Sequence, residues 1–110
     1  VTDLAGCAET GALEGTCEQV MDGSPAQVPG HYARTSPQEL VPLGVPQRVF
    51  HGLVDTVVPI DQSRAYVAAA AAAGDDVTLT EQADANHFTV LEARTPAWRQ
   101  VRATVDQLLA

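Results

Sequence analysis

A strand, a helix and a second strand follow one another between Val45 and Phe88, and this order constrains the fold more than any other feature. Residues 48–52 form a short strand-like run, residues 61–73 are rich in alanine, and residues 77–81 alternate apolar and polar side chains. Successive parallel strands need a crossover connection, usually a helix, and such crossovers are right-handed. The pattern therefore predicts an α/β fold with two parallel strands joined by a helix.

Single residues indicate where these elements end. Asp61 is predicted to cap the helix, and Gly74 to stop it in a left-handed conformation. Gly52, at the end of the first strand, predicts a close approach of its backbone to another segment. Thr95 and Pro96 are predicted to start a last helix that carries a continuous apolar stripe. That stripe consists of Trp98, Val101, Val105, Leu108 and Leu109.

For the N-terminal part, residues 1–4 look like the end of a strand, and the sequence after them predicts helices. Residues 6–15 are expected to be a loose polar segment that leads into an amphipathic helix, which Asp22 and Gly23 would stop. The apolar face of that helix comprises Leu13, Cys17, Val20 and Met21.

Two further short helices are predicted from a repeated local pattern. Ser24-Pro25 and Ser36-Pro37 each combine a capping serine with a proline at the first helical position and a Gln or Glu three residues after the serine. The segment Pro29–Tyr32 between them is predicted to be a turn. His31 within it is expected to be exposed.

Two parallel strands are too few for an independently stable sheet, and the first strand would leave an open edge. We therefore expect either the C-terminal portion of a larger α/β domain or a chain whose sheet is completed by another chain. The 110 residues allow one domain at most. We divide it into a helical segment at 1–44 and a C-terminal strand–helix–strand–helix unit at 45–110.

Composition excludes several classes of partner. The chain has 14 acidic residues against six basic ones, for a net charge of −8, so neither nucleic acid nor an anionic membrane surface is expected to bind it. The longest apolar run, Ala68–Ala73, is too short to span a membrane. The absence of a signal peptide favours the cytoplasm, although a processed chain could have lost one. Cys7 and Cys17 could pair, but the sequence leaves this open.

Asp55 and His87 are the candidate catalytic residues. Each follows a predicted strand at its carboxyl end, where ligands gather in open parallel sheets. A carboxylate there can accept the Nδ1 proton of the imidazole and support the charge that develops when Nε2 takes up a proton. These are two members of a nucleophile, base and acid triad. The third would be a Ser or Cys on a sharp turn, and the chain contains no Gly-x-Ser-x-Gly sequence.

Several residues together carry a resemblance to a known family. They are Ser36-Pro37, Val45-Pro46, Phe50-His51-Gly52, Asp55, Val58-Pro59, Ser63, Tyr66, Ala73-Gly74 and His87-Phe88. With this pattern the chain resembles the C-terminal part of an α/β-hydrolase of the prolyl-oligopeptidase-like or esterase and lipase branches. The resemblance implies that Asp55 is the catalytic acid and His87 the base, and that the nucleophile elbow lies outside this chain. It also implies that residues 1–44 are a helical cap or lid-like segment.

Other assignments of the site are weaker. His51 is expected to pack or hydrogen-bond near the site without taking part in the chemistry, and Asp84 competes with Asp55 as the acid but is expected to be solvated. A metal held by His51, Asp55 and His87 is disfavoured, because the three do not share a helix face. None of the serines is expected to be the nucleophile, because Ser24 and Ser36 are expected to cap helices and Ser63 lies within a helical turn.

Two functions follow from these features. The first is the acid- and histidine-bearing part of a serine hydrolase that cleaves ester, amide or peptide bonds and uses no cofactor or metal. The second is a non-catalytic, truncated hydrolase-fold module that pairs with a partner through its open sheet edge. The sequence does not identify the substrate.

Overall fold

Two parallel strands form the centre of the computed structural model, which describes residues 1–110. Strand β1 (Gln47–Gly52) pairs along its whole length with β2 (Val77–Gln82), from Gln47 opposite Val77 to Gly52 opposite Gln82. Helix α4 (Ile60–Ala72) connects the two strands. The predicted strand, helix and parallel strand are thus confirmed, and the chain is a small α/β domain with a two-stranded sheet.

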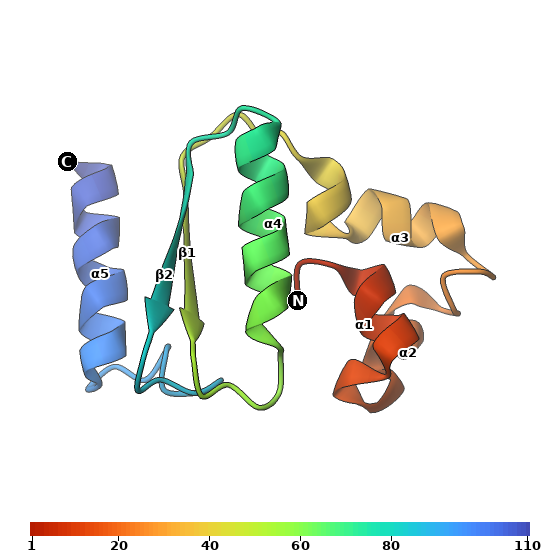
Figure 1. Ribbon diagram of the computed structural model, residues 1–110, viewed down its shortest axis with the longest axis horizontal. Coiled ribbons are helices and arrows are strands. Elements are labelled where there is room, and N and C mark those ends of the chain that lie inside the picture. The colour runs from red at the N-terminus through yellow and green to blue at the C-terminus, as the bar shows by residue number, and fades with distance from the viewer.

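Helices lie on both sides of the strands, although no residue of the C-terminal helix is buried. Figure 1 shows α4 on one side of the strands and α5 (Pro96–Leu109) on the other. Tyr66 and Ala70 of α4 are buried, and the Tyr66 hydroxyl donates a hydrogen bond to the side chain of Gln47. The predicted capping of α5 is confirmed, because the Thr95 hydroxyl accepts a hydrogen bond from the backbone of Trp98 at 3.1 Å.

The ends of α4 confirm one prediction and correct another. Gly74 follows the helix with a φ of +97°, the positive value that favours glycine at this position. Asp61, however, is not the N-cap: α4 begins at Ile60 after Pro59, and Asp61 lies in its first turn. Its carboxylate instead faces Arg64 at 3.3 Å.

The N-terminal part consists of helices α1 (Leu4–Thr10), α2 (Thr16–Met21) and α3 (Pro29–Thr35), with 3₁₀ turns at Ala12–Gly15 and Pro37–Leu40. The loose segment predicted at 6–15 is wrong, because the Asp3 side chain accepts a hydrogen bond from Gly6 N at 2.9 Å and starts a helix there. The turn predicted at Pro29–Tyr32 is also wrong: this segment is the first turn of α3.

The amphipathic helix predicted across Leu13 to Met21 is divided in the structure. Leu13 lies in the preceding 3₁₀ turn with a φ of +62°, and α2 starts only at Thr16. Cys17 and Met21 are buried as predicted, whereas Val20 is exposed. The stop at Asp22 is confirmed, with this residue in a left-handed conformation.

The repeated serine pattern starts a helix in one copy only. The 3₁₀ helix Pro37–Leu40 begins after Ser36 with Pro37 at its first position, as predicted. Gln27 Oε1 accepts a hydrogen bond from Ser24 N at 2.9 Å, but the residues after Ser24 form a turn, not a helix. Ser36 makes no capping hydrogen bond. Its buried hydroxyl accepts from Leu4 N at 2.9 Å and donates to Thr2 O at 3.3 Å, so a contact distant in sequence replaces the local one.

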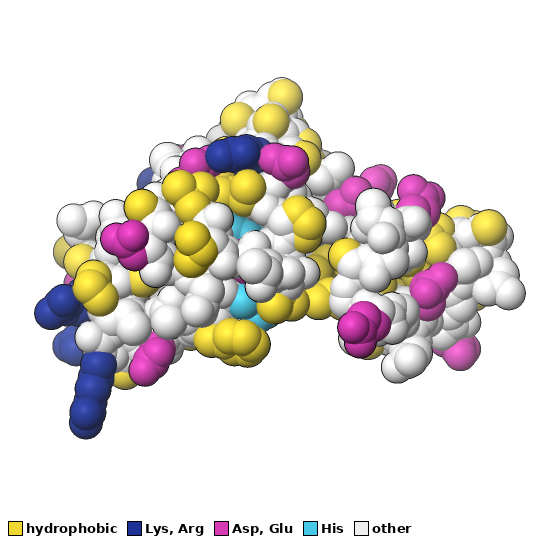
Figure 2. All heavy atoms as spheres, turned by 60° about the horizontal axis from the view of Figure 1, so that its bottom comes forward, with side chains coloured by type: hydrophobic (Ala, Val, Ile, Leu, Met, Phe, Trp, Pro, Cys, Tyr) yellow, Lys and Arg dark blue, Asp and Glu magenta, His cyan; other side chains and the backbone are white.

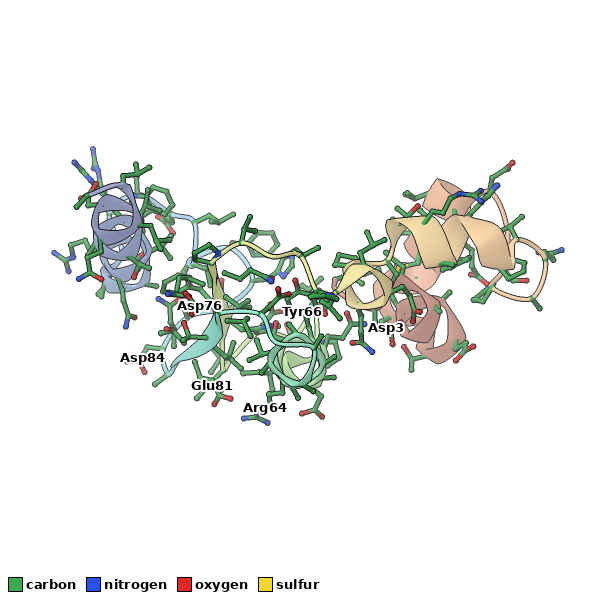
Figure 3. All side chains as sticks on the ribbon, turned by 90° about the horizontal axis from the view of Figure 1, so that it is seen from above. Asp3, Arg64, Tyr66, Asp76, Glu81 and Asp84 are labelled. Carbon is green, nitrogen blue, oxygen red and sulfur yellow. A yellow bond between two sulfur atoms is a disulfide. The ribbon has the colours of Figure 1, made fainter.

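A disulfide between Cys7 and Cys17 joins α1 to α2, with their Cα atoms 6.4 Å apart. Both cysteines are buried with Met21 and Tyr32 in a small core of the N-terminal part. This part adjoins the α/β part through Gln62, whose Oε1 accepts hydrogen bonds from Thr2 N at 3.0 Å and from Asp3 N at 3.2 Å. Figure 3 shows the N-terminal helices as a separate cluster beside α4.

The molecule exposes much surface for its size. Only 13 of 110 residues are buried, and the accessible surface is 6751 Å², against about 5,800 Å² expected for a compact monomer of this mass. One edge of β1 has no partner strand. On α5, Val105, Leu108 and Leu109 of the predicted stripe are exposed. No helix is long and apolar enough to cross a membrane.

Candidate active site

Asp55 and His87, 32 residues apart in the sequence, meet at the carboxyl ends of the two strands. His87 Nδ1 lies 2.9 Å from Asp55 Oδ2. Asp55 follows the end of β1 after three residues, and His87 follows β2 after five. The structure therefore brings together the two residues that the sequence predicted as acid and base.

Gly52 allows this meeting. Beyond it, Leu53 N donates to Gln82 O at 2.9 Å and Val54 N donates to Ala85 O at 3.1 Å, which draws the loop after β2 onto the end of β1. A Cβ atom on Gly52 would overlap the carbonyl group of Ala85. The close backbone approach predicted at this glycine is confirmed, and it places Asp55 and His87 on facing loops.

Asp55 is held as an ionised acceptor. Its side chain is only 6% exposed, and Oδ1 accepts hydrogen bonds from Val57 N at 2.8 Å and Val58 N at 2.9 Å. Burial by itself raises the pKa of Asp55, but the hydrogen bonds from Val58, His87 and Val57 outweigh it and lower that pKa below its ordinary value. Asp55 therefore stays charged at neutral pH.

The charge on Asp55 fixes the tautomer of His87. An ionised carboxylate only accepts hydrogen bonds, so Nδ1 of His87 carries the proton and donates it to Oδ2. In the neutral ring Nε2 then bears the free lone pair, and Nε2 has no hydrogen-bond partner within the chain. The side chain is 38% exposed, and its ring meets that of Phe88 edge to face. His87 thus presents a basic nitrogen outward.

His51 lies buried beneath this pair. Its Nδ1 is 2.7 Å from Ser63 Oγ, and its Nε2 is 3.0 Å from Val58 O and 3.5 Å from Asp55 Oδ2. The sequence placed His51 near the site. It gave no indication that the ring joins three segments: the end of β1, the Asp55 turn and the first turn of α4.

A cavity of about 320 Å³ opens beside the pair and is lined by Asp55, His87, Val1 and Leu91 among others. Figure 2 views the molecule from the carboxyl ends of the strands, and histidine side chains reach the surface near its centre. To the right of them, the N-terminal helices show several acidic side chains and no basic one in this view. His87 and the cavity beside it therefore lie at this end of the molecule.

The competing residues lie elsewhere. Asp84 is exposed at the outer rim of the molecule and makes no hydrogen bond to His87 (Figure 3). His31 is exposed, as predicted, with its Nδ1 2.8 Å from Met21 O. Ser63 and Ser36 are buried, and their hydroxyls are engaged by His51 and by Thr2 and Leu4. No serine hydrogen-bonds to His87.

Although His51, Asp55 and His87 converge, the chain contains no group of three His, Cys, Asp or Glu side chains arranged to hold a metal ion. Both nitrogens of His51 face other partners, a serine hydroxyl and a carbonyl oxygen. Within this trio, only His87 and Asp55 share a hydrogen bond, and His51 Nε2 lies 3.5 Å from Asp55 Oδ2.

Two features of the site were missed from the sequence. The first is the pair of amide groups, at Val57 and Val58, that bind Asp55. An Asp followed by a turn is a recognisable signal for such bonding, so this contact could have been anticipated. The second is the Ser63–His51 contact, which depends on how α4 packs against β1 and has no local signal.

Comparison of the chain with protein-family models, curated proteins and solved structures finds no match. The function is therefore inferred from the geometry of the site.

Proposed function

We propose that this chain supplies the acid and the base of a serine hydrolase of the α/β-hydrolase type, which cleaves ester, amide or peptide bonds. The nucleophilic serine would lie outside these 110 residues. The observation that carries the proposal is the 2.9 Å contact between His87 Nδ1 and Asp55 Oδ2, which leaves Nε2 of His87 free.

In this reaction, Nε2 of His87 accepts the proton of the serine hydroxyl as the serine oxygen attacks the substrate carbonyl carbon. The imidazolium that forms is stabilised by Asp55, which remains ionised because its pKa is lowered. The same proton then passes from Nε2 to the leaving alcohol or amine, which departs. Water repeats the sequence and releases the acid product and the free serine.

The acid role of Asp55 is tested once the chain is assembled with the part that carries the nucleophile. Replacing Asp55 by Asn permits the wrong His87 tautomer, so we expect kcat to fall by about 10⁴, as in a trypsin-like triad. Asp84→Asn is the matched control and should leave kcat within twofold. A loss of less than tenfold in the Asp55→Asn enzyme at saturating substrate would contradict the assignment.

The chain by itself is expected to be inactive, because no serine reaches His87. Incubation with activated esters should give no turnover above buffer, and a serine-directed fluorophosphonate should leave the mass of the chain unchanged. Covalent labelling of any serine in the isolated chain would show that the nucleophile lies within these residues and would overturn this part of the proposal.

A second candidate is a non-catalytic module that binds a partner through the free edge of β1. The open edge and the small number of buried residues favour it. Size-exclusion chromatography with light scattering separates the possibilities. A stably folded monomer of 11.6 kDa would contradict the need for any partner. A folded homodimer would favour the binding module, since the isolated chain is expected to be inactive under either proposal.

A further inference from the structure

We infer that His51 is a positioning residue, which holds the Asp55 turn in place through hydrogen bonds that run from Ser63 through its ring to Val58. The inference rests on the proposed role of Asp55 as the acid of the site. It assigns to two buried side chains a role that neither the sequence pattern nor the acid and base pair itself contains.

The tautomer of His51 follows from its partners. A carbonyl oxygen can only accept a hydrogen bond, so Nε2 carries the proton and donates it to Val58 O at 3.0 Å. Nδ1 of the neutral ring is then an acceptor, and the Ser63 hydroxyl donates to it at 2.7 Å. The Val58 carbonyl thus selects the Nε2–H form of His51, and the Ser63 hydroxyl, which can donate, satisfies the other ring nitrogen.

Val58 links His51 to the acid. Its carbonyl is held by His51, while its amide N–H donates to Asp55 Oδ1 at 2.9 Å. The Nε2 atom of His51 is also 3.5 Å from Asp55 Oδ2, the oxygen that accepts from His87. The two histidines are the titratable groups that face this carboxylate. A displaced His51 ring would free the Val58 peptide and disturb both oxygens of Asp55.

Packing alone does not require a polar ring at this position. His51 is 7% exposed and Ser63 is also 7% exposed. Burying an imidazole and a hydroxyl costs free energy that their hydrogen bonds at best offset. Burying apolar side chains at the same positions would stabilise the fold. The buried polar side chains of His51 and Ser63 are thus explained by the turn that they hold, which orients Asp55.

The experiment uses the chain as it stands and NMR of labelled protein. The ¹³C shift of the Asp55 carboxyl reports its titration, and the ¹⁵N shifts of His87 report its tautomer. In His51→Leu we expect Asp55 to titrate about one pH unit higher than in the original chain, because its amide hydrogen bonds weaken. The fraction of His87 rings in the Nδ1–H tautomer should fall measurably. Ser63→Ala should produce smaller changes in the same direction.

Conservative rescue separates positioning from packing. His51→Gln keeps an N–H donor for Val58 O and should return the Asp55 titration most of the way to its position in the original chain, although it packs less well than the ring. Ala68→Ser, which adds a hydroxyl on the exposed face of α4, is the matched control and should change neither the Asp55 nor the His87 signal. Circular dichroism checks that each variant is folded, and Ser63→Ala decides the question if His51→Leu does not fold.

Two outcomes would overturn the inference. One is an Asp55 titration and a His87 tautomer that stay unchanged in folded Ser63→Ala or His51→Leu protein. The other is a His51→Gln variant that shifts as far as His51→Leu, since the ring would then act only by packing. Neither readout requires turnover. If the assembled protein proves not to be a hydrolase, these signals still show whether His51 positions Asp55.

Discussion

The single residue Gly52 determines whether Asp55 and His87 can meet. A Cβ atom at this position would overlap the backbone carbonyl of Ala85, and backbone atoms cannot rotate away as a side chain can. We expect Gly52→Ala to lower the free energy of unfolding by about 2 kcal/mol, within the range for overpacked positions. The ¹⁵N signal of His87 Nδ1 should also lose the signature of its hydrogen bond to Asp55.

Gly44→Ala is the matched control for this prediction. Gly44 has a φ of +70° and open space around the place of a Cβ. The alanine variant should therefore cost about 1 kcal/mol from its backbone conformation alone and leave the His87 signal unchanged. Equal effects of the two variants on His87 would contradict the role given to the close approach at Gly52.

At the residue scale, the sequence predicted features that depend on position along one strand or loop. Asp55, His87 and Gly52 could be found because strand ends of a parallel crossover share one edge. The partners of Ser36 and His51 could not, because those hydroxyl and ring contacts depend on how separate helices pack. Asp61 and Ser36 both looked like helix caps, and each is used by a different partner in the structure.

At the element scale, the Cys7–Cys17 disulfide holds α1 and α2 together where few other buried side chains do. A bond that closes a short loop typically adds about 2–4 kcal/mol of stability, mainly by restricting the unfolded chain. We expect reduction, or the Cys7→Ser and Cys17→Ser double variant, to increase amide hydrogen exchange throughout α1 and α2. Exchange measured by mass spectrometry at neutral pH, with and without reductant, tests this.

The strands provide the internal control. Amides of β1 and β2 take part in a ladder that the disulfide does not touch, and their protection should change little on reduction. Loss of protection across the sheet together with the helices would mean that the N-terminal part and the α/β part unfold as one unit. That result would contradict a local role for the disulfide.

The elements themselves were predictable to different degrees. The strands, α4 and α5 were found because their length, periodicity and end residues agree. The short helices of the N-terminal part were misplaced, since α1, α2 and α3 have only six or seven residues each. Isolated helices of that length are unstable, so tertiary contacts such as Ser36 with Leu4 decide where they start.

At the scale of the whole molecule, four carboxyl groups make the fold sensitive to acid. Their pKa values lie below the ordinary range. At Asp55, hydrogen bonds from Val58, His87 and Val57 outweigh the opposing effect of burial. The backbone amides of Gly44 and Leu43 lower the pKa of Asp75 by hydrogen bonding. Hydrogen bonds from arginine side chains do the same for the other two groups, from Arg48 to Asp76 and from Arg64 to Glu81. Each group binds protons less readily when folded than when unfolded. Each therefore adds stability above about pH 4, and that stability is lost as the pH falls through the folded-state pKa.

We predict that the melting temperature, followed by circular dichroism, declines steeply between pH 5 and pH 3. Asp75→Asn should lower it at pH 7, because the hydrogen bonds to Leu43 and Gly44 weaken. In the same variant the melting temperature should decline less steeply below pH 5, since one carboxyl group that takes up a proton on unfolding has been removed. An unchanged slope in Asp75→Asn would contradict the linkage at this carboxyl group.

The anchoring of Thr2 and Asp3 on Gln62 has a practical consequence. It leaves Val1 among the residues that line the cavity beside Asp55 and His87. A fluorophore placed on residue 1 would therefore lie beside that cavity and report on ligands that enter next to His87.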